Sequence, residues 1–327
     1  MSWRWVFFIS SFADVAIQLI GIFFLQETYA PILLNKKANK LRKTTGDEKY
    51  ISEYELGDEA LPHKLALALI RPIKLLATQP IVQVLAVFQA YVYGMTFIVY
   101  ATFPTLWTQR YGQSMSTSGL HYIAPSIGFL IGTQILGRVN DIIYRRLTIR
   151  YNGETRPEYR APIAVPGTLF IMIGLFWYGW SAQARYVCKH RQVISQTNLK
   201  SRLFWLVPDV GITIFSLGCD VIFQCTGSYV IDCYGRYAAS AFAAVVLLRS
   251  LCAFGFPLFA QAMYDSLGYG WGTFKHRASL NQSKTDNVSG NSILAFVTIF
   301  LGVPAPFALW KWGPSLRARS TYASDKI

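Results

Sequence analysis

Seven apolar runs in this sequence are each long enough to cross a lipid bilayer, which takes about 20 mostly apolar residues. Within lipid, only α-helices and closed barrels satisfy every backbone hydrogen bond, and runs of this length are typical of helices. The sequence therefore predicts an all-α, polytopic membrane protein with about seven transmembrane helices. The predicted spans are Trp5–Leu25, Gln79–Ala101, Thr117–Leu136, Pro162–Ala182, Phe204–Ile231, Tyr237–Met263 and Ser292–Trp310.

The charge content supports lipid as the surrounding solvent. Charged residues make up 15% of the sequence and hydrophobic residues 53%, whereas soluble domains carry about 25% charged residues. The net charge of +14 comes from basic residues that lie between the apolar runs. This distribution is typical of the excess of Lys and Arg on the cytosolic side of membrane proteins, and nucleic-acid binding would need a continuous basic face. We expect the lipid bilayer as a partner and no nucleic acid.

The basic segment Glu27–Lys43 sets the expected orientation, because Lys and Arg next to a span favour the cytosolic side. With this segment in the cytosol, alternation also places the basic loop Arg138–Ala161 and the C-terminal tail there. Two further loops, Gln183–Leu203 and Tyr264–Asn291, also carry basic residues although alternation places them outside. The C-terminus is therefore predicted to be cytosolic, with these two loops as exceptions.

About fifty residues separate the first two spans. Lys36–Lys49 is predicted to form a short basic helix. Pro62–Leu76 is predicted to form a second helix, with apolar residues on one side and basic residues interspersed among them. Both patterns suit helices that lie on a membrane surface. The alternative is an unstructured linker.

Polar residues within spans are the first candidates for a transport pathway, because burying them in lipid is unfavourable. Asp220 stands out, since a carboxylate in mid-span must be neutral or partnered; it is either a proton or cation site or the partner of Arg249. His121, near an outer end, is expected to be an interface residue rather than a proton relay. The pathway candidates are Asp14, Gln83, Gln89, Tyr91, Gln134, Asp220, Gln224 and Arg249.

A charged stretch follows the third span. Gly137 allows the helix to end and turn, Asp141 can pair with an arginine, and Arg145 and Arg146 can pair with carboxylates or lipid phosphate. The alternative is an ordinary basic loop. None of the five cysteines forms a CxxC pair, and no cofactor, metal or enzyme motif is present in the sequence. We therefore predict no cofactor and no enzymatic activity.

The spacing of Gly137, Asp141, Arg145 and Arg146 resembles the loop motif of the major facilitator superfamily. Other stretches resemble its fungal drug:proton antiporter branch, and together they cover nearly the whole chain. These stretches are Trp3–Trp5, Glu27–Pro31, Arg156–Arg160, Phe176–Trp180, Tyr237–Ala241, Phe256–Phe259 and Leu267–Gly272.

This resemblance implies two six-helix halves around a central pathway, working by alternating access. It also implies exchange of small organic compounds (drug-, toxin- or polyamine-like) for protons, at the plasma membrane. In the family, cytosolic charges latch one conformation. Carried over by match, that gating network consists of Glu27, Gly137, Asp141, Arg145, Arg146, Glu158 and Arg160.

The resemblance begins at the family's sixth helix, so we expect a partial fold with one helix of the N-terminal half and a complete C-terminal half. The expected parts are the last N-half helix (1–26), a cytosolic central loop (27–78), the C-terminal half (79–310) and a tail (311–327). As an N-terminally truncated chain it is expected to be inactive alone. The alternative is a non-transporting membrane fragment, or association partner, from an incomplete gene model with retained introns.

Two inserts, 185–203 and 273–290, interrupt the resemblance. Arg185-Tyr186-Val187 and Gly272-Thr273-Phe274 can be encoded by fungal splice-donor sequences, and branch-site-like codons are possible near the far ends. We interpret both inserts as translated introns. The alternative is two genuine outer loops, with glycosylation acceptors at Asn281 and Asn287.

Overall fold

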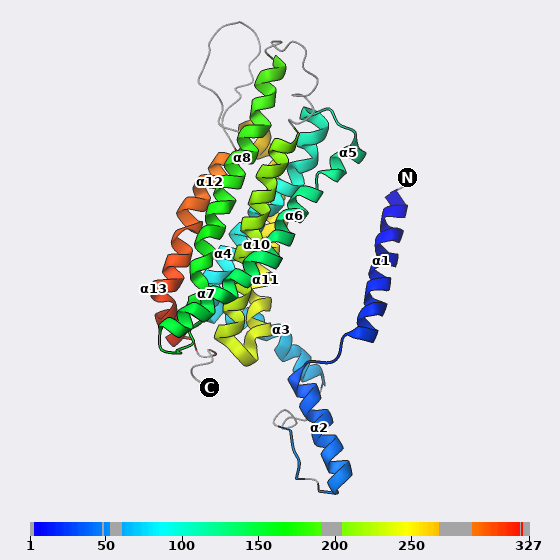
Figure 1. The fold of residues 1–327 in the computed structure, drawn as a ribbon, viewed down its shortest axis with the longest axis vertical. Helices are drawn as coiled ribbons and strands as arrows, with labels where there is room; N and C mark the ends of the chain where they lie inside the picture. The colour runs from blue at the N-terminus through cyan, green and yellow to red at the C-terminus, as the bar shows by residue number, and fades with distance from the viewer. Residues whose placement is uncertain are drawn as a thin grey trace. The chain divides into compact units, whose positions relative to one another are not determined.

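The computed structural model describes residues 3–47, 49–52, 61–190, 205–267, 290–320 and 322. Within these ranges the chain is helical apart from its turns, with no β-strand (Figure 1). Seven described helical segments are long and apolar enough to cross a membrane. The predicted all-α polytopic fold is therefore confirmed. The chain divides into two units, residues 1–67 and 68–327.

The first unit contains α1 (Trp3–Phe24) and α2 (Ala30–Thr45). α2 begins next to Pro31 and ends at Gly46, whose positive φ of 70° lets its N–H bond to the Arg42 carbonyl. α3 (Leu61–Thr78) begins in this unit and continues into the second. The connection between the first two spans therefore contains two helices rather than an unstructured linker. α2 begins before the predicted start at Lys36, and the position of both helices on a membrane surface stays a prediction.

The second unit is a helical bundle in which several spans are built from consecutive short elements. Its first span joins α4 (Pro80–Thr105) to the π-helical turn η1 (Leu106–Arg110). The remaining elements are α5 (Met115–Leu120), α6 (Ile123–Ile131), η2 (Gly132–Leu136), α7 (Gly137–Arg150), η3 (Pro157–Ile163), α8 (Ala164–His190), α10 (Leu206–Tyr234), η4 (Gly235–Tyr237), α11 (Ala238–Leu267), α12 (Gly290–Val297), η5 (Thr298–Gly302) and α13 (Pro304–Ala318).

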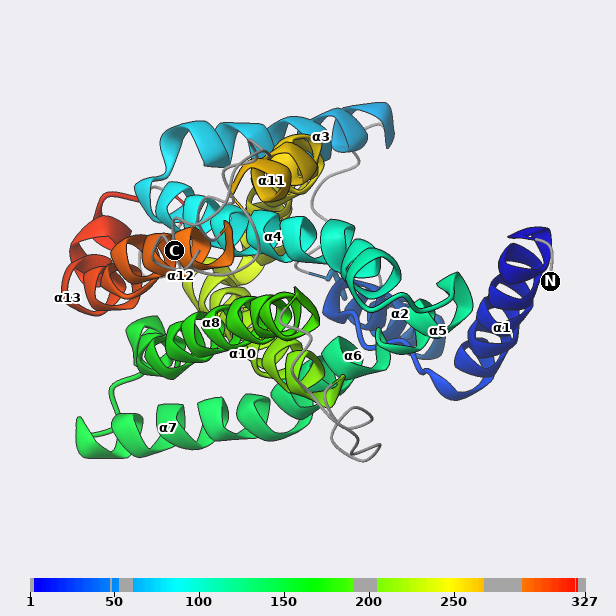
Figure 2. The same ribbon diagram turned by 90° about the horizontal axis from the view of Figure 1, so that it is seen from above.

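α10 lies at the centre of this bundle, packed against α8, α6, α11 and α4, and α4 packs along α11 (Figure 2). Glycines allow the close approach of α10 to α8. A Cβ atom on Gly218 would lie 2.6 Å from the backbone nitrogen of Ile171, and one on Gly211 would lie 2.7 Å from that of Tyr178. Small residues at such contacts are the usual means of helix packing in membranes.

The helix does not end at Gly137, contrary to the sequence-based expectation. Gly137 has ordinary helical angles (φ −59°, ψ −45°) and opens α7, which continues to Arg150. The turn comes at Asn152 and Gly153, which have φ values of 58° and 85°. The reason is that residues 138–150 contain no glycine or proline, and charged side chains do not stop a helix.

The two predicted inserts fall mostly outside the described residues. Residues 185–190 continue α8, and residue 290 begins α12; residues 191–203 and 273–289 are not described. Their interpretation as translated introns stays a prediction, and so do the boundaries proposed for the four parts of the chain.

Candidate functional site

Arg160 lies between two carboxylates at one end of the bundle. Its Nη1 donates to Asp141 Oδ1 on α7 at 3.0 Å, and its Nε donates to Asp232 Oδ2 on α10 at 2.5 Å. The guanidinium also lies 4.7 Å from the centre of the Tyr144 ring. We call Asp141, Tyr144, Arg160 and Asp232 the Arg160 cluster. Because Arg160 belongs to η3, the cluster ties α7, η3 and α10 together.

The two carboxylates of the cluster differ in their exposure to solvent. The side chain of Asp141 is 62% exposed, whereas those of Asp232 and Arg160 are 24% and 14% exposed. Exposed ion pairs contribute little to stability, but breaking a largely buried pair is costly. The Asp141 bond is therefore the one that can open easily, while the Asp232 bond holds Arg160 in place.

Glu158 forms a second pair, with Arg317 of α13. The Oε1 atom lies 3.5 Å from Arg317 Nε, and the Glu158 side chain is 4% exposed. Gly313, one turn before Arg317, leaves room for this side chain, since a Cβ there would lie 2.8 Å from Glu158 Cγ. This pair ties η3 to the last helix of the bundle.

The remaining members of the predicted gating network do not join these pairs within the described residues. Arg145 and Arg146 are exposed on α7, and neither forms an ion pair in that part of the chain. Glu27 belongs to the first unit, where its Oε1 accepts from the Tyr29 N–H at 2.8 Å. The structure thus brings together Asp141 and Arg160, and the gating role of the predicted set stays a prediction.

Asp220 lies halfway along α10 with two polar neighbours. Its Oδ2 accepts from Thr133 Oγ1 at 3.1 Å and from Gln224 Nε2 at 3.4 Å. Thr133 belongs to the π-helical turn η2, and the preceding Gly132 permits the approach, because a Cβ there would lie 2.5 Å from Asp220 Oδ2. Such π-turns are frequent at functional sites. Of the pathway candidates, the structure brings together Asp220 and Gln224.

Arg249 does not pair with Asp220 in the part of the chain that the structure describes. Its guanidinium instead lies over the Tyr93 ring, 4.7 Å from the ring centre. The alternative of an Asp220–Arg249 pair is therefore wrong.

Gln89, another pathway candidate, is fully buried. Neither polar atom of its amide has a hydrogen-bond partner among the described residues.

The other polar candidates lie on exposed positions. Gln83 donates to the Ala77 carbonyl at 2.9 Å and so supports the junction of α3 and α4. Gln134 is exposed in η2. Asp14, in the first unit, accepts from Gln18 at 3.0 Å. A pathway role for these three residues stays a prediction.

Tyr91 is expected to be a packing residue, and its replacement by phenylalanine tests this. Its hydroxyl lies 2.8 Å from Thr298 Oγ1 and donates to the Leu294 carbonyl at 3.2 Å, which ties α4 to α12 and η5. We expect Tyr91→Phe to lower the free energy of unfolding by about 1 kcal/mol, the usual net contribution of a hydrogen bond. A detergent unfolding titration measures it; unchanged stability would contradict a packing role.

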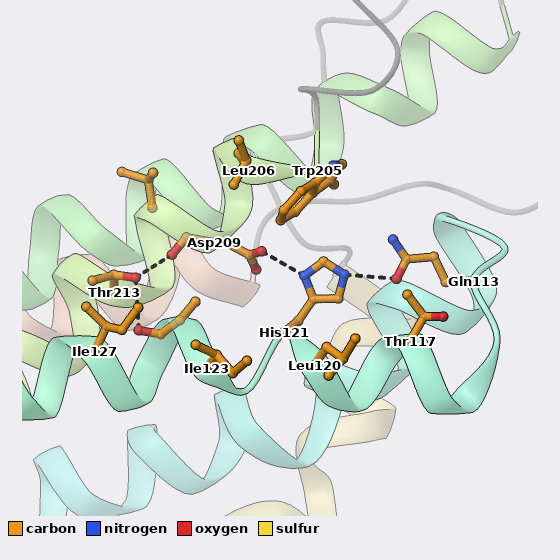
Figure 3. A pocket seen from close by; sticks show the side chains of 12 residues that line it. Gln113, Thr117, Leu120, His121, Ile123, Ile127, Trp205, Leu206, Asp209 and Thr213 are labelled. Carbon is orange, nitrogen blue, oxygen red and sulfur yellow. Dashed lines mark hydrogen bonds and ion pairs between the residues drawn. The ribbon is translucent and has the colours of Figure 1, made fainter.

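A cavity of about 530 Å³ opens between α6 and α10 (Figure 3). It lies at the first turns of α10, whereas Asp232 of the Arg160 cluster lies at the last turn of that helix. His121 and Asp209 line it and are bonded to each other, with 2.7 Å between Nδ1 and Oδ2. The other ring nitrogen, Nε2, lies 2.9 Å from Gln113 Oε1. The imidazole stacks on Trp107, with 3.5 Å between ring centres and 4° between planes.

His121 was expected at an interface, yet it is buried, and sequence reasoning missed its pairing with Asp209. It also missed Asp232 and Arg317, the partners of Arg160 and Glu158. These pairs join residues far apart in the chain, so no spacing pattern could have found them. The only available signal was the presence of acidic residues within or at the end of an apolar span.

Seven described helical segments long and apolar enough to cross a membrane, packed around polar groups and ion pairs, define a polytopic membrane protein. The chain belongs to the Major Facilitator Superfamily, whose sequence profile matches residues 1–257. The relatives that carry this family's profile are membrane transporters rather than enzymes.

Curated relatives are fungal transporters. The chain is 43% identical over 323 residues to the efflux pump vrtL of Penicillium aethiopicum, covering 99% of this chain and 57% of the relative. It is 38% identical to the probable efflux pump mfs2 of Aspergillus flavus (97% and 67% covered) and 35% identical to the MFS-type transporter oryF of Aspergillus oryzae (98% and 58%). The chain thus spans about 57–67% of the length of these relatives. No solved structure gives a significant match.

Proposed function

We propose that this chain serves proton-coupled export of small organic compounds, of the drug, toxin or polyamine type, by alternating access. It would do so at the plasma membrane, with its C-terminus in the cytosol. The observation that carries the proposal is the Arg160 cluster, because alternating access needs contacts at one end of the bundle that can open and close. The relatives named as efflux pumps support export as the direction.

In this mechanism the Arg160 cluster stabilises the state in which its end of the bundle is closed. Opening separates Asp141 from Arg160 at little cost, since Asp141 is largely exposed. Arg160 keeps its bond to Asp232, so the charge of Arg160 stays paired when Asp141 moves away. The α7 segment can therefore move while η3 and α10 stay joined.

Asp220 is the proposed proton or cation site of the pathway. Thr133 and Gln224 both donate to it, which stabilises the carboxylate form. A bound proton or substrate cation would replace part of that stabilisation. The carboxylate can thus exist with or without a bound cation, as antiport requires.

Reconstitution in liposomes with a pH gradient tests the function. The 327-residue chain alone is expected to move no protons when organic compounds are added, because the central pathway of this family runs between two six-helix halves. Supplying the part of vrtL that the chain does not match should restore compound-dependent proton movement, and Asp220→Asn should abolish it again. The fluorescence of a pH-sensitive dye inside the liposomes measures proton movement, and protein-free liposomes are the control.

Compound-dependent proton movement by the chain alone would contradict the expectation that an added N-terminal half is needed, although not the proton-coupled export itself. No movement in either arm, with the two parts still bound to each other, would favour a membrane protein that associates with others but does not transport.

A further inference from the structure

Arg249 is a charged side chain in the middle of a membrane-spanning helix, and no carboxylate neutralises it. It lies near the centre of the 21-residue apolar span Ala238–Leu258 of α11. Among the residues that the structure describes, its Nε atom has no hydrogen-bond partner and its guanidinium belongs to no ion pair. A charge within a span is unfavourable unless an opposite charge or a polar group meets it. The partner of Arg249 therefore comes from outside the described residues.

The helices packed against α11 do not supply that partner. α4, which lies along α11 (Figure 2), and α12 contain no charged residue. On α10, Asp209 lies in the first turn and Asp232 in the last. Asp220, halfway along that helix, accepts instead from Thr133 and Gln224. The positive charge of Arg249 is therefore available to a ligand.

The terminal nitrogens of Arg249 are the atoms that a ligand can reach. The side chain is half-buried, and its Nε atom is inaccessible to solvent, a burial that the two Nη atoms do not share. The guanidinium lies 4.7 Å from the centre of the Tyr93 ring and 6.0 Å from that of Phe242. These rings hold the guanidinium in place without neutralising it. Its Nη atoms can then donate two parallel hydrogen bonds to a carboxylate, the group that a guanidinium matches in shape and charge.

The aromatic side chains beside Arg249 indicate the body of such a ligand. The Tyr93 ring lies 5.0 Å from the Phe97 ring and 5.4 Å from the Phe223 ring, between ring centres. Phe97 is 38% exposed, and Tyr93 and Phe223 are partly exposed. Exposed aromatic rings favour contact with a further aromatic ring, stacked or edge to face. A flat aromatic compound that carries an acidic group therefore fits both the charge and the rings.

We propose that Arg249 binds the acidic group of an aromatic organic acid, whose ring system packs against Tyr93 and Phe97. This inference rests on the proposed function, since the acid would be an exported compound. It narrows the broad substrate class given above (drug, toxin or polyamine) to organic anions with an aromatic body. It also gives the unneutralised charge of α11 a role that helix packing does not require.

The test measures equilibrium binding to the full chain in phosphatidylcholine nanodiscs, with empty nanodiscs to subtract lipid partitioning. The probes are radiolabelled 2-naphthoic acid, which is ionised at neutral pH, and its neutral analogue 2-naphthamide. We expect Arg249→Gln to weaken acid binding by about tenfold or more, because a charge-assisted pair is lost, and to change amide binding less than about twofold. Arg150→Gln, the same change at an exposed position at the end of α7, should change neither.

Arg249→Lys separates the charge from the shape of the guanidinium. Lysine keeps the positive charge but has no planar fork for two parallel hydrogen bonds. Acid binding in this variant should be weaker than in the parent chain and tighter than in Arg249→Gln, with amide binding unchanged. Acid binding no tighter than in Arg249→Gln would show that the acid does not recognise the charge, and would overturn the site.

Phe97→Ala provides a second readout that removes no charge, in case Arg249→Gln does not fold. Because the Phe97 ring is partly exposed, its removal should leave the bundle intact. Both probes should bind about threefold more weakly or worse, since both lose a ring contact. Undiminished binding of both probes would overturn the proposed position of the aromatic body.

Equally tight acid binding in the parent chain and in Arg249→Gln would overturn the inference, and so would a parent chain that binds no acid. Two additions identify other partners. Acid binding should persist when part of the lipid is replaced by phosphatidylglycerol, and when the part of vrtL that the chain does not match is supplied. Loss of binding in the first case would assign Arg249 to lipid phosphate, and in the second to a carboxylate of the added part; either loss overturns the inference.

The binding test and the liposome test fail separately. Equilibrium binding needs no transport, so a negative liposome result leaves the binding test decisive. Conversely, compound-dependent proton movement that is unchanged in Arg249→Gln overturns only the present inference and leaves the proposed function standing.

Discussion

Replacing Arg160 by glutamine is expected to lower the free energy of unfolding by about 3 kcal/mol, the usual effect of removing one partner from a largely buried ion pair. The reason is that Asp232, with a side chain only 24% exposed, loses the guanidinium that lies 2.5 Å away. Glutamine can donate to one carboxylate but cannot neutralise it. An unfolding titration in mixed micelles measures the loss.

The same variant should loosen this end of the bundle. Cys225 is buried, and its thiol donates to the Arg160 carbonyl at 3.1 Å. Movement of η3 away from α10 would expose the thiol, so maleimide labelling of Cys225, followed by peptide mass spectrometry, should accelerate at least tenfold in Arg160→Gln. Cys219 is also buried and lies nearer the N-terminus of α10 than Cys225. It provides an internal reference whose labelling should not change.

Asp141→Asn is the matched control, since it removes the other carboxylate of the Arg160 cluster. Its side chain is 62% exposed, so the expected loss of stability is below about 1 kcal/mol. Losses of equal size in the two variants would show that Asp232 is not the stronger partner. In the reconstituted transporter Asp141→Asn should nevertheless favour the open state, because the bond it removes is the one that opens.

The sequence predicted the number and type of spans because that information is local: a run of apolar residues is visible without knowing what packs against it. It could not predict the partners of Arg160 and His121, which lie 72 and 88 residues away along the chain. In the sequence, Asp232 directly follows the predicted span Phe204–Ile231 and Asp209 lies inside that span, and neither position indicates a partner. Only the packing of η3 and α6 against α10 turns them into pairs.

The sequence also could not predict which of three glutamines in the spans would be buried. Gln83, Gln89 and Gln134 all lie in predicted spans, yet Gln89 is fully buried while the other two are exposed. A period of 3.6 residues places Gln83 and Gln89 on different faces of α4, but which face turns inward depends on neighbouring helices. Similarly, Gly137 was assigned a turn that belongs to Asn152 and Gly153, because a glycine can equally continue a helix.

Glycine residues on α10 give the second large expected effect. Gly218→Ala should lower the free energy of unfolding by about 3 kcal/mol, at the upper end of the usual range for overpacking. The added Cβ would lie 2.6 Å from the Ile171 nitrogen and 2.7 Å from the Gly167 carbonyl oxygen. Both are backbone atoms of α8, which cannot rotate aside as a side chain can, so the two helices would have to separate along their contact.

Gly227→Ala, nine residues further along the same helix, is the matched control. A Cβ there meets only the edge of the Phe242 ring at 3.5 Å, which is ordinary van der Waals contact. Alanine is the better helix former by about 1 kcal/mol, so this variant should be as stable as the parent or more so. Unfolding titrations of both variants measure the contrast. Equal stability of the two would mean that α8 can move away from α10 freely, and the central position of α10 would then not depend on its glycines.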